Sequence, residues 1–213
     1  MSISLKRATD FDLYLVTDRT QTRGRDLLAV IEQALLGGVR AIQLREKDLS
    51  GKELFSLAEK IKTLCARHGA SLFINDRIDI ALAVDAEGVQ LGSGSMPIDA
   101  ARQLVGDTKL IGASTHSAEE ALAAERAGAD FVLFGPVYFT PSKAAYGNPQ
   151  GLERLQEAVE KISLPVYAIG GVKAENVPAI KKTGARGAAL ISAVMSAEEP
   201  AAAMKELLRL LKE

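Results

Sequence analysis

The sequence predicts one α/β domain folded as a parallel (β/α)8 TIM barrel. Eight short apolar runs recur along its 213 residues, and each is apolar almost throughout, as in strands that are buried on both faces. Amphipathic stretches with helical spacing separate the runs. Polar side chains that can bind ligands or take part in catalysis come directly after the runs. In a parallel barrel the carboxyl ends of all strands lie at one mouth.

The predicted strands follow one another at regular intervals, and they cover residues 12–17, 39–44, 71–75, 88–91, 109–113, 130–134, 165–169 and 187–191. Between the second and third runs, residues 50–68 place Leu54, Ala58 and Ile61 on one helical face. Ser50 and Glu53 form a capping-box pattern at the start of this helix. Residues 117–127 show a second helix, and Ser117 with Glu120 repeats the capping pattern.

An open doubly wound sheet is the alternative arrangement of alternating strands and helices. Such folds commonly carry a glycine-rich dinucleotide loop after the first strand, and this chain has LYLVTDRTQTRGRD there instead. No linker or change in composition marks a boundary, so residues 1–213 are expected to form a single barrel domain.

Composition narrows the classes of function. The net charge is −1, which argues against nucleic acid as a main partner. No apolar run reaches the length of a membrane span, and the first residues lack a signal-peptide core, so we expect a cytoplasmic protein without membrane contact. One cysteine and two histidines leave oxygen ligands as the donors for any metal.

The segment QLREK follows the second predicted strand. Alternation points Gln43, Arg45 and Lys47 the same way, toward the lumen and mouth if Ile42 and Leu44 face the helices. Two cations there need an anionic ligand or a carboxylate partner. The alternative is a solvated loop in which Glu46 and Asp48 neutralise them.

Two further polar groups follow strands. Asp76, beside Asn75, could hold Mg²⁺ or could begin a turn before the next helix. Ser114 could bind phosphate and His116 could transfer protons, but both could also lie at an ordinary helix start.

The last three strands carry a phosphate-binding pattern. Thr140, Ser142 and Lys143 begin a loop that extends to about residue 151 and could clamp an anion or be a surface excursion. Gly170 and Gly171 follow the seventh run and Ser192 the eighth, where barrels frequently bind phosphate through backbone N–H groups.

Together these segments resemble the thiamine phosphate synthase family. The resemblance covers Asp12 to about Pro200 and rests on LYLVTD, QLREK, the Asn75–Asp76 pair, STHS, GPVYFTPSK, AIGG and ISAV. It implies a (β/α)8 barrel that joins hydroxymethylpyrimidine diphosphate to a thiazole phosphate and releases diphosphate, a transferase of thiamine biosynthesis.

The resemblance also implies roles for single residues. Those for the pyrimidine diphosphate are Gln43, Leu44, Arg45, Glu46, Lys47, Asn75, Ser114 and Lys143. Those for the thiazole phosphate are Thr140, Pro141, Ser142, Gly170, Gly171, Ile191 and Ser192. Asp76 would hold Mg²⁺, and Arg45, Lys47 and Lys143 would stabilise the departing diphosphate.

One departure from the family pattern leaves alternatives open. Ser95 stands where a second, acidic metal ligand is expected. The segment around it looks more like the related thiazole tautomerases, which need no metal and in which the histidine matching His116 would be the acid/base. A catalytically weak barrel that binds thiamine intermediates is a third hypothesis. A homo-oligomer is also possible, because the Ala-rich segment 201–211 could pack on a partner or on the barrel itself.

Overall fold

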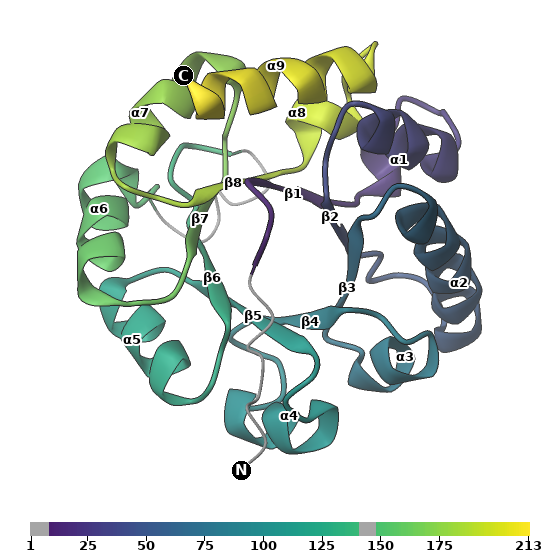
Figure 1. The fold of residues 1–213 in the computed structure, drawn as a ribbon, viewed down its shortest axis with the longest axis horizontal. Coiled ribbons are helices and arrows are strands. Elements are labelled where there is room, and N and C mark those ends of the chain that lie inside the picture. Colours follow the sequence, from purple (N-terminus) through teal and green to yellow (C-terminus); the bar gives the residue numbers. More distant parts are fainter. Residues whose placement is uncertain (1–8, 141–147) are drawn as a thin grey trace.

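The computed structural model describes residues 9–140 and 148–213, and its strands form a closed barrel in the order β1 to β8. Every neighbouring pair is parallel, including β1 with β8 (Figure 1). The strands are β1 Leu13–Val16, β2 Ala41–Leu44, β3 Ser71–Asn75, β4 Gly88–Leu91, β5 Leu110–Thr115, β6 Phe131–Phe134, β7 Val166–Ile169 and β8 Gly187–Leu190. The predicted fold class is confirmed, and β5 extends beyond its expected end because Ser114 and Thr115 still pair with β6.

Helices surround the barrel and connect successive strands (Figure 1). They are η1 Arg19–Gln21, α1 Leu27–Leu36, α2 Gly51–Arg67, α3 Ile78–Ala83, α4 Ile98–Val105, α5 Ala118–Arg126, α6 Gly151–Lys161, η3 Ala174–Asn176, α7 Val177–Lys182, α8 Ser192–Met195 and α9 Pro200–Lys212. Within the described ranges, none of them is long and apolar enough to cross a membrane.

The two predicted helix caps have different outcomes. Ser50 and Glu53 form the complete capping box of α2. Ser117 caps α5 by accepting the Glu120 N–H at 3.2 Å. The Glu120 carboxylate, however, accepts the backbone N–H of His116 at 2.8 Å rather than that of Ser117. The second capping box is therefore shifted by one residue.

The C-terminal helix α9 packs on the barrel's own helices α1, α7 and α8. Its Met204 and Leu207 are buried, and a Cβ at Gly37 would lie 2.7 Å from the Ala201 carbonyl oxygen. This close approach shows that the apolar face of α9 is used within the chain.

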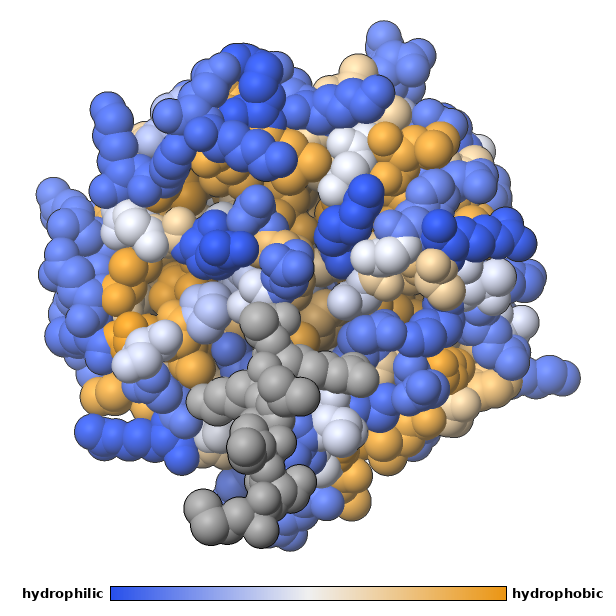
Figure 2. All heavy atoms as spheres, in the orientation of Figure 1, coloured by the Kyte–Doolittle hydropathy of each residue, from blue (hydrophilic) through white to orange (hydrophobic). Residues whose placement is uncertain are grey.

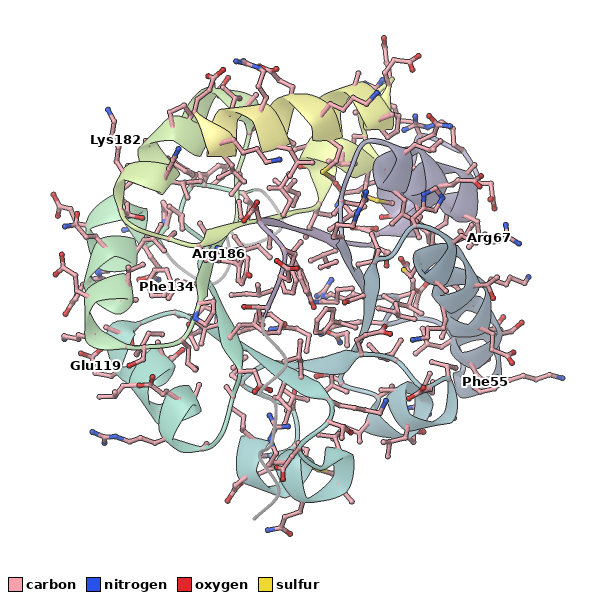
Figure 3. The ribbon with its side chains drawn as sticks, viewed as in Figure 1. Phe55, Arg67, Glu119, Phe134, Lys182 and Arg186 are labelled. Atoms are coloured by element: carbon pink, nitrogen blue, oxygen red, sulfur yellow. The ribbon has the colours of Figure 1, made fainter. Side chains whose placement is uncertain are left out.

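The barrel has two apolar cores. The larger lies between the sheet and the helices, where Figure 3 shows Phe134 of β6 directed outward, and it includes Cys65. Burial raises the pKa of the Cys65 thiol to about 12, which supports a structural role. The smaller core fills the lumen with five aromatic rings, those of Phe11, Tyr14, Phe73, Phe131 and Tyr167. It fills the lumen below the mouth, so a site inside the barrel would open at the carboxyl ends of the strands.

Ion pairs surround the N-terminal face of the barrel, which is opposite to the mouth. Figures 1 to 3 show the molecule from this N-terminal face. Arg102 binds Asp130 at 2.5 Å, and Lys62 binds Glu87 at 2.5 Å. Both carboxylates also accept a strand N–H, from Ile111 at 2.7 Å and Leu72 at 2.8 Å. Arg186, labelled in Figure 3, pairs with Asp12. Hydrophilic side chains gather around the rim of this face over the helices (Figure 2).

Candidate active site

The lumen side chains just below the mouth divide into a polar half and an apolar half. Strands β2 to β5 contribute amides and a hydroxyl, from Gln43, Asn75, Gln90 and Ser114. Strands β6, β7, β8 and β1 contribute Leu133, Ile169, Ala189 and Val16. One side of the mouth is therefore suited to hydrogen-bonding a polar ligand, and the other to packing an apolar ring.

Gln43 lies in the lumen, as the alternation predicted. Its side-chain Nε2 donates to the Tyr14 hydroxyl at 3.3 Å, and the residue is only 2% exposed. Ile42 and Leu44 lie in the outer core against the helices. The Leu44 side chain therefore does not reach the mouth, and only its main chain is placed to contact a ligand.

The four charges that follow β2 are not paired with one another. Arg19, from the loop after β1, binds the Glu46 carboxylate at 3.2 Å and the Asp48 carboxylate at 2.5 Å. Within residues 9–140 and 148–213, no carboxylate lies in ion-pair contact with Arg45 or Lys47. Ion pairing of Glu46 and Asp48 with the two cations is therefore wrong, although Lys47 and Asp48 are exposed, as that alternative of a solvated loop expects.

The carboxylate of Asp18 lies within the field of Arg45. Burial raises its pKa, but hydrogen bonds from Thr20 and Gln21 and the Arg45 charge outweigh burial and leave the pKa lowered. Asp18 caps η1 through the Thr20 N–H at 3.0 Å, so its oxygens already have donors. The Arg45 guanidinium is left available to a ligand.

Asp76 has the geometry of a specialised position after β3. Its φ of 60° lies in the left-handed region, which non-glycine residues rarely adopt and which is frequent at functional sites. The exposed carboxylate accepts from Asn75 at 2.8 Å and from the Ser95 hydroxyl, which also accepts the Gly92 N–H at 2.6 Å. Ser95 thus lies directly beside the predicted metal ligand, as the family resemblance implied.

The described residues contain no cluster of three His, Cys, Asp or Glu side chains that could hold a metal. Mg²⁺ does not need such a cluster, because it commonly binds one or two carboxylates and completes its shell with water and substrate phosphates. The exposed Asp76 carboxylate fits that role, and the neutral Ser95 hydroxyl adds a weak oxygen ligand at most.

Gln90 is a candidate site residue that sequence reasoning missed. It is 1% exposed, its Nε2 donates to Ser114 at 3.1 Å, and its Oε1 is buried without a partner in the described structure. Its backbone oxygen accepts the Asp76 N–H at 3.0 Å. The sequence signal was a glutamine in the middle of an apolar strand, because a buried amide needs hydrogen-bond partners.

His116 lies at the edge of the mouth rather than inside it. Its side chain is 42% exposed, and Nδ1 lies 3.1 Å from the Glu120 carboxylate, one helical turn ahead. Its backbone N–H is bound to the same carboxylate. These contacts match the helix-start interpretation, in which His116 is a neighbour of the α5 cap.

The apolar half of the mouth contains closely packed main chain. Gly170 and Gly171 have positive φ. A Cβ at Gly170 would lie 2.5 Å from Pro136, and a Cβ at Gly171 would lie 2.7 Å from Tyr138. The glycines therefore serve a close approach between two loops as well as a turn. The N–H groups of both are unpaired within the described residues, as is the buried Thr140 hydroxyl.

Helix α8 follows β8 at the same side of the mouth. Its Ile191 carbonyl accepts the Val194 and Met195 N–H groups, while the N–H groups of Ser192 and Ala193 have no acceptor in the part of the chain that is described. This is the place where barrels commonly bind phosphate. The predicted residues Pro141, Ser142 and Lys143 lie outside the described residues.

Comparison with known proteins identifies close relatives. A family model described as thiamine monophosphate synthase matches residues 13–194. A putative thiamine-phosphate synthase of Geobacter sulfurreducens is 54% identical over 95% of both chains. A thiamine-phosphate synthase of Desulfitobacterium hafniense (strain Y51) is 46% identical over 95% of this chain and 98% of its own.

A solved structure agrees with these matches. Thiamine phosphate pyrophosphorylase from Pyrococcus furiosus is 40% identical, with a TM-score of 0.87 over 95% of this chain and 96% of its own. A 3-hexulose-6-phosphate synthase at 23% identity and a TM-score of 0.67 shares the fold alone. The relatives from Geobacter, Desulfitobacterium and Pyrococcus are named for thiamine phosphate synthesis, so the tautomerase alternative is not supported.

Proposed function

We propose, for a chain that belongs to the thiamine monophosphate synthase family, that the barrel mouth joins a pyrimidine diphosphate to a thiazole phosphate and releases diphosphate. The observation that carries this proposal is the pair of cations after β2, Arg45 and Lys47, which have no carboxylate partner in the described structure. They stand at the end of the polar half of the mouth, where a diphosphate needs charge compensation.

The reaction breaks the bond between the pyrimidine methylene carbon and a diphosphate oxygen, and the electron pair leaves with the oxygen. Arg45, Lys47 and Lys143 stabilise the negative charge of the departing diphosphate. The lone pair of the thiazole nitrogen then forms the new bond to the methylene carbon. No protein nucleophile is needed, so the chain acts by positioning and by charge stabilisation.

The polar half of the mouth binds the pyrimidine diphosphate in this proposal. Gln43 and Asn75 present amides to the ring, and the Ser114 hydroxyl is free to donate because Gln90 donates to its oxygen. Glu46 contributes through its main chain, since Arg19 occupies its carboxylate.

Mg²⁺ would be held by Asp76 and by the substrate's own phosphates. When bound, the ion supplies positive charge that stabilises the diphosphate. Asn75 and Ser95 hold the Asp76 carboxylate in place through hydrogen bonds to its two oxygens. Ser95 leaves this site with one negative charge fewer than two carboxylates would give.

The apolar half receives the thiazole phosphate. Ile169 and Ile191 offer apolar surface to the thiazole ring, and the unpaired N–H groups of Gly171 and Ser192 can bind its phosphate. The buried Thr140 hydroxyl, with Pro141 and Ser142 after it, adds a further polar contact from the β6 loop. In this proposal the two reacting rings lie side by side over the lumen.

The experiment is to incubate the purified protein with both substrates and Mg²⁺, and to measure thiamine phosphate by chromatography. We expect one thiamine phosphate for each diphosphate released, and no product when either substrate or Mg²⁺ is left out. Failure to form product with all components present would refute the proposed function.

A further inference from the structure

Arg19 connects the first two loops of the mouth through several hydrogen bonds. Its backbone N–H lies 3.1 and 3.2 Å from the two oxygens of Glu46, and its guanidinium reaches the same carboxylate at 3.2 Å. The guanidinium also binds Asp48 through both of its terminal nitrogens, with both contacts at 2.5 Å. One residue of the β1 loop thus occupies both carboxylates that follow β2.

Glu46 stands between the two cations of the proposed diphosphate site, Arg45 and Lys47. Its side chain is only 3% exposed, so its charge requires a close partner. Arg19 provides that partner from outside the segment. A second contact fixes the same stretch of backbone, because the Arg45 N–H donates to the buried Thr17 hydroxyl at 2.9 Å.

We propose that Arg19 is a positioning residue of the diphosphate site, which holds Glu46 and Asp48 so that they cannot neutralise Arg45 and Lys47. This inference rests on the proposed function. Arg19 acts through the two carboxylates and does not itself contact substrate. Without it, Glu46 would lose the ion pair that the structure gives it, and pairing with the cations adjacent in sequence would compete with the diphosphate.

Arginine is suited to this task in a way that lysine is not. Its planar fork can bind two carboxylates at once, whereas an ammonium group is a single point of charge. The Asp48 contact lowers the pKa of that carboxyl group, and the pKa of Arg19 is raised by Asp48 first and by Glu46 next. Both groups are therefore charged at neutral pH.

The test is the substitution Arg19→Met, which keeps the apolar stem and removes the charge. We expect the KM for the pyrimidine diphosphate to rise about tenfold, the effect of weakening one charged contact to a phosphate group. The KM for the thiazole phosphate should stay within about twofold, because its site lies on the other half of the mouth.

Arg102→Met is the matched control. Arg102, from helix α4, also binds a carboxylate, Asp130, but on the N-terminal face. Arg102→Met should lower the free energy of unfolding, as Arg19→Met does. It should leave the KM values for the pyrimidine diphosphate and the thiazole phosphate unchanged. If Arg19→Met does not fold, Arg19→Lys keeps the charge without the fork and should give a smaller rise of about threefold.

A double variant separates positioning from a merely structural role. Arg19→Met with Glu46→Gln removes the carboxylate that would otherwise attract Arg45, so most of the lost affinity for the pyrimidine diphosphate should return. A double variant as weak as or weaker than Arg19→Met would overturn the proposal, as would an unchanged KM in Arg19→Met.

Binding of inorganic diphosphate with Mg²⁺, measured by calorimetry, distinguishes this proposal from the proposed function. If the wild type forms no thiamine phosphate but binds diphosphate, the proposed function fails, and the same ranking of variants in Kd still supports the role of Arg19. If the wild type binds no diphosphate, both proposals are refuted.

Discussion

The two ends of the barrel differ in how completely their polar groups are paired. On the N-terminal face, Asp130 and Glu87 each bind both a cation and a strand N–H. At the mouth, Arg45 has no ion pair and Gln90 Oε1 has no hydrogen-bond partner within the described residues. Buried polar groups are normally satisfied, so groups left open at one end point to a ligand. The comparison supports the proposal that the mouth binds substrate, while the paired charges of the N-terminal face stabilise the fold.

Arg45→Met should produce the largest effect. Removing one group that stabilises a departing anion costs about 10²- to 10³-fold in rate. We expect kcat/KM for diphosphate release to fall by that amount, while the urea midpoint of unfolding stays close to that of the wild type. A variant that unfolds more easily but retains its rate would remove the contrast between the two ends.

Asp130→Ala should show the reverse behaviour. It removes the acceptor of the Ile111 N–H and the carboxylate partner of Arg102, whose guanidinium keeps its backbone carbonyl acceptors, at a cost of about 2 kcal/mol in the free energy of unfolding. Urea denaturation measures this loss. The kcat for diphosphate release in the folded variant should match the wild type, and a large fall in kcat would show that the N-terminal face also affects the reaction.

Ser95→Asp tests whether a second carboxylate beside Asp76 strengthens Mg²⁺ binding. The added carboxylate lies beside Asp76 and contributes on the order of 1 kcal/mol to binding of a cation at an exposed site. The Mg²⁺ concentration for half-maximal diphosphate release should therefore fall about fivefold. Ser93→Asp, two residues earlier, adds the same charge away from this contact and is the control. Equal shifts in both variants would mean that general charge, not a ligand, is responsible.

His116→Asn should have the smallest effect. The histidine has an exposed contact with Glu120, and such pairs contribute about 0.5 kcal/mol. We expect the rate of diphosphate release to change by about twofold at most. A loss of 100-fold or more would return His116 to the reaction as an acid/base.

The fold could be predicted from the sequence because the same pattern, a short apolar run, recurs in every strand. All eight strands begin and end within two residues of the positions predicted from apolar runs, including the longer β5. Strand alternation also placed Gln43 correctly. Burial on both faces requires apolar runs in every strand, so each strand supports the prediction for the others.

The contacts between loops could not be predicted in the same way. Arg19 and Glu46 are 27 residues apart, and each looks like an ordinary loop charge in the sequence. The Gln90–Ser114 bond depends on the register between β4 and β5, which local patterns do not fix. The close approach of Gly170 to Pro136 likewise depends on two loops meeting in space.

The most direct measurement is the affinity for inorganic diphosphate with Mg²⁺ in the wild type, Arg45→Met and Arg102→Met. Both variants remove one guanidinium, one at each end of the barrel. We predict that Arg102→Met binds as tightly as the wild type and that Arg45→Met binds at least about tenfold more weakly. Equal affinities in all three proteins would contradict the assignment of the mouth as the diphosphate site.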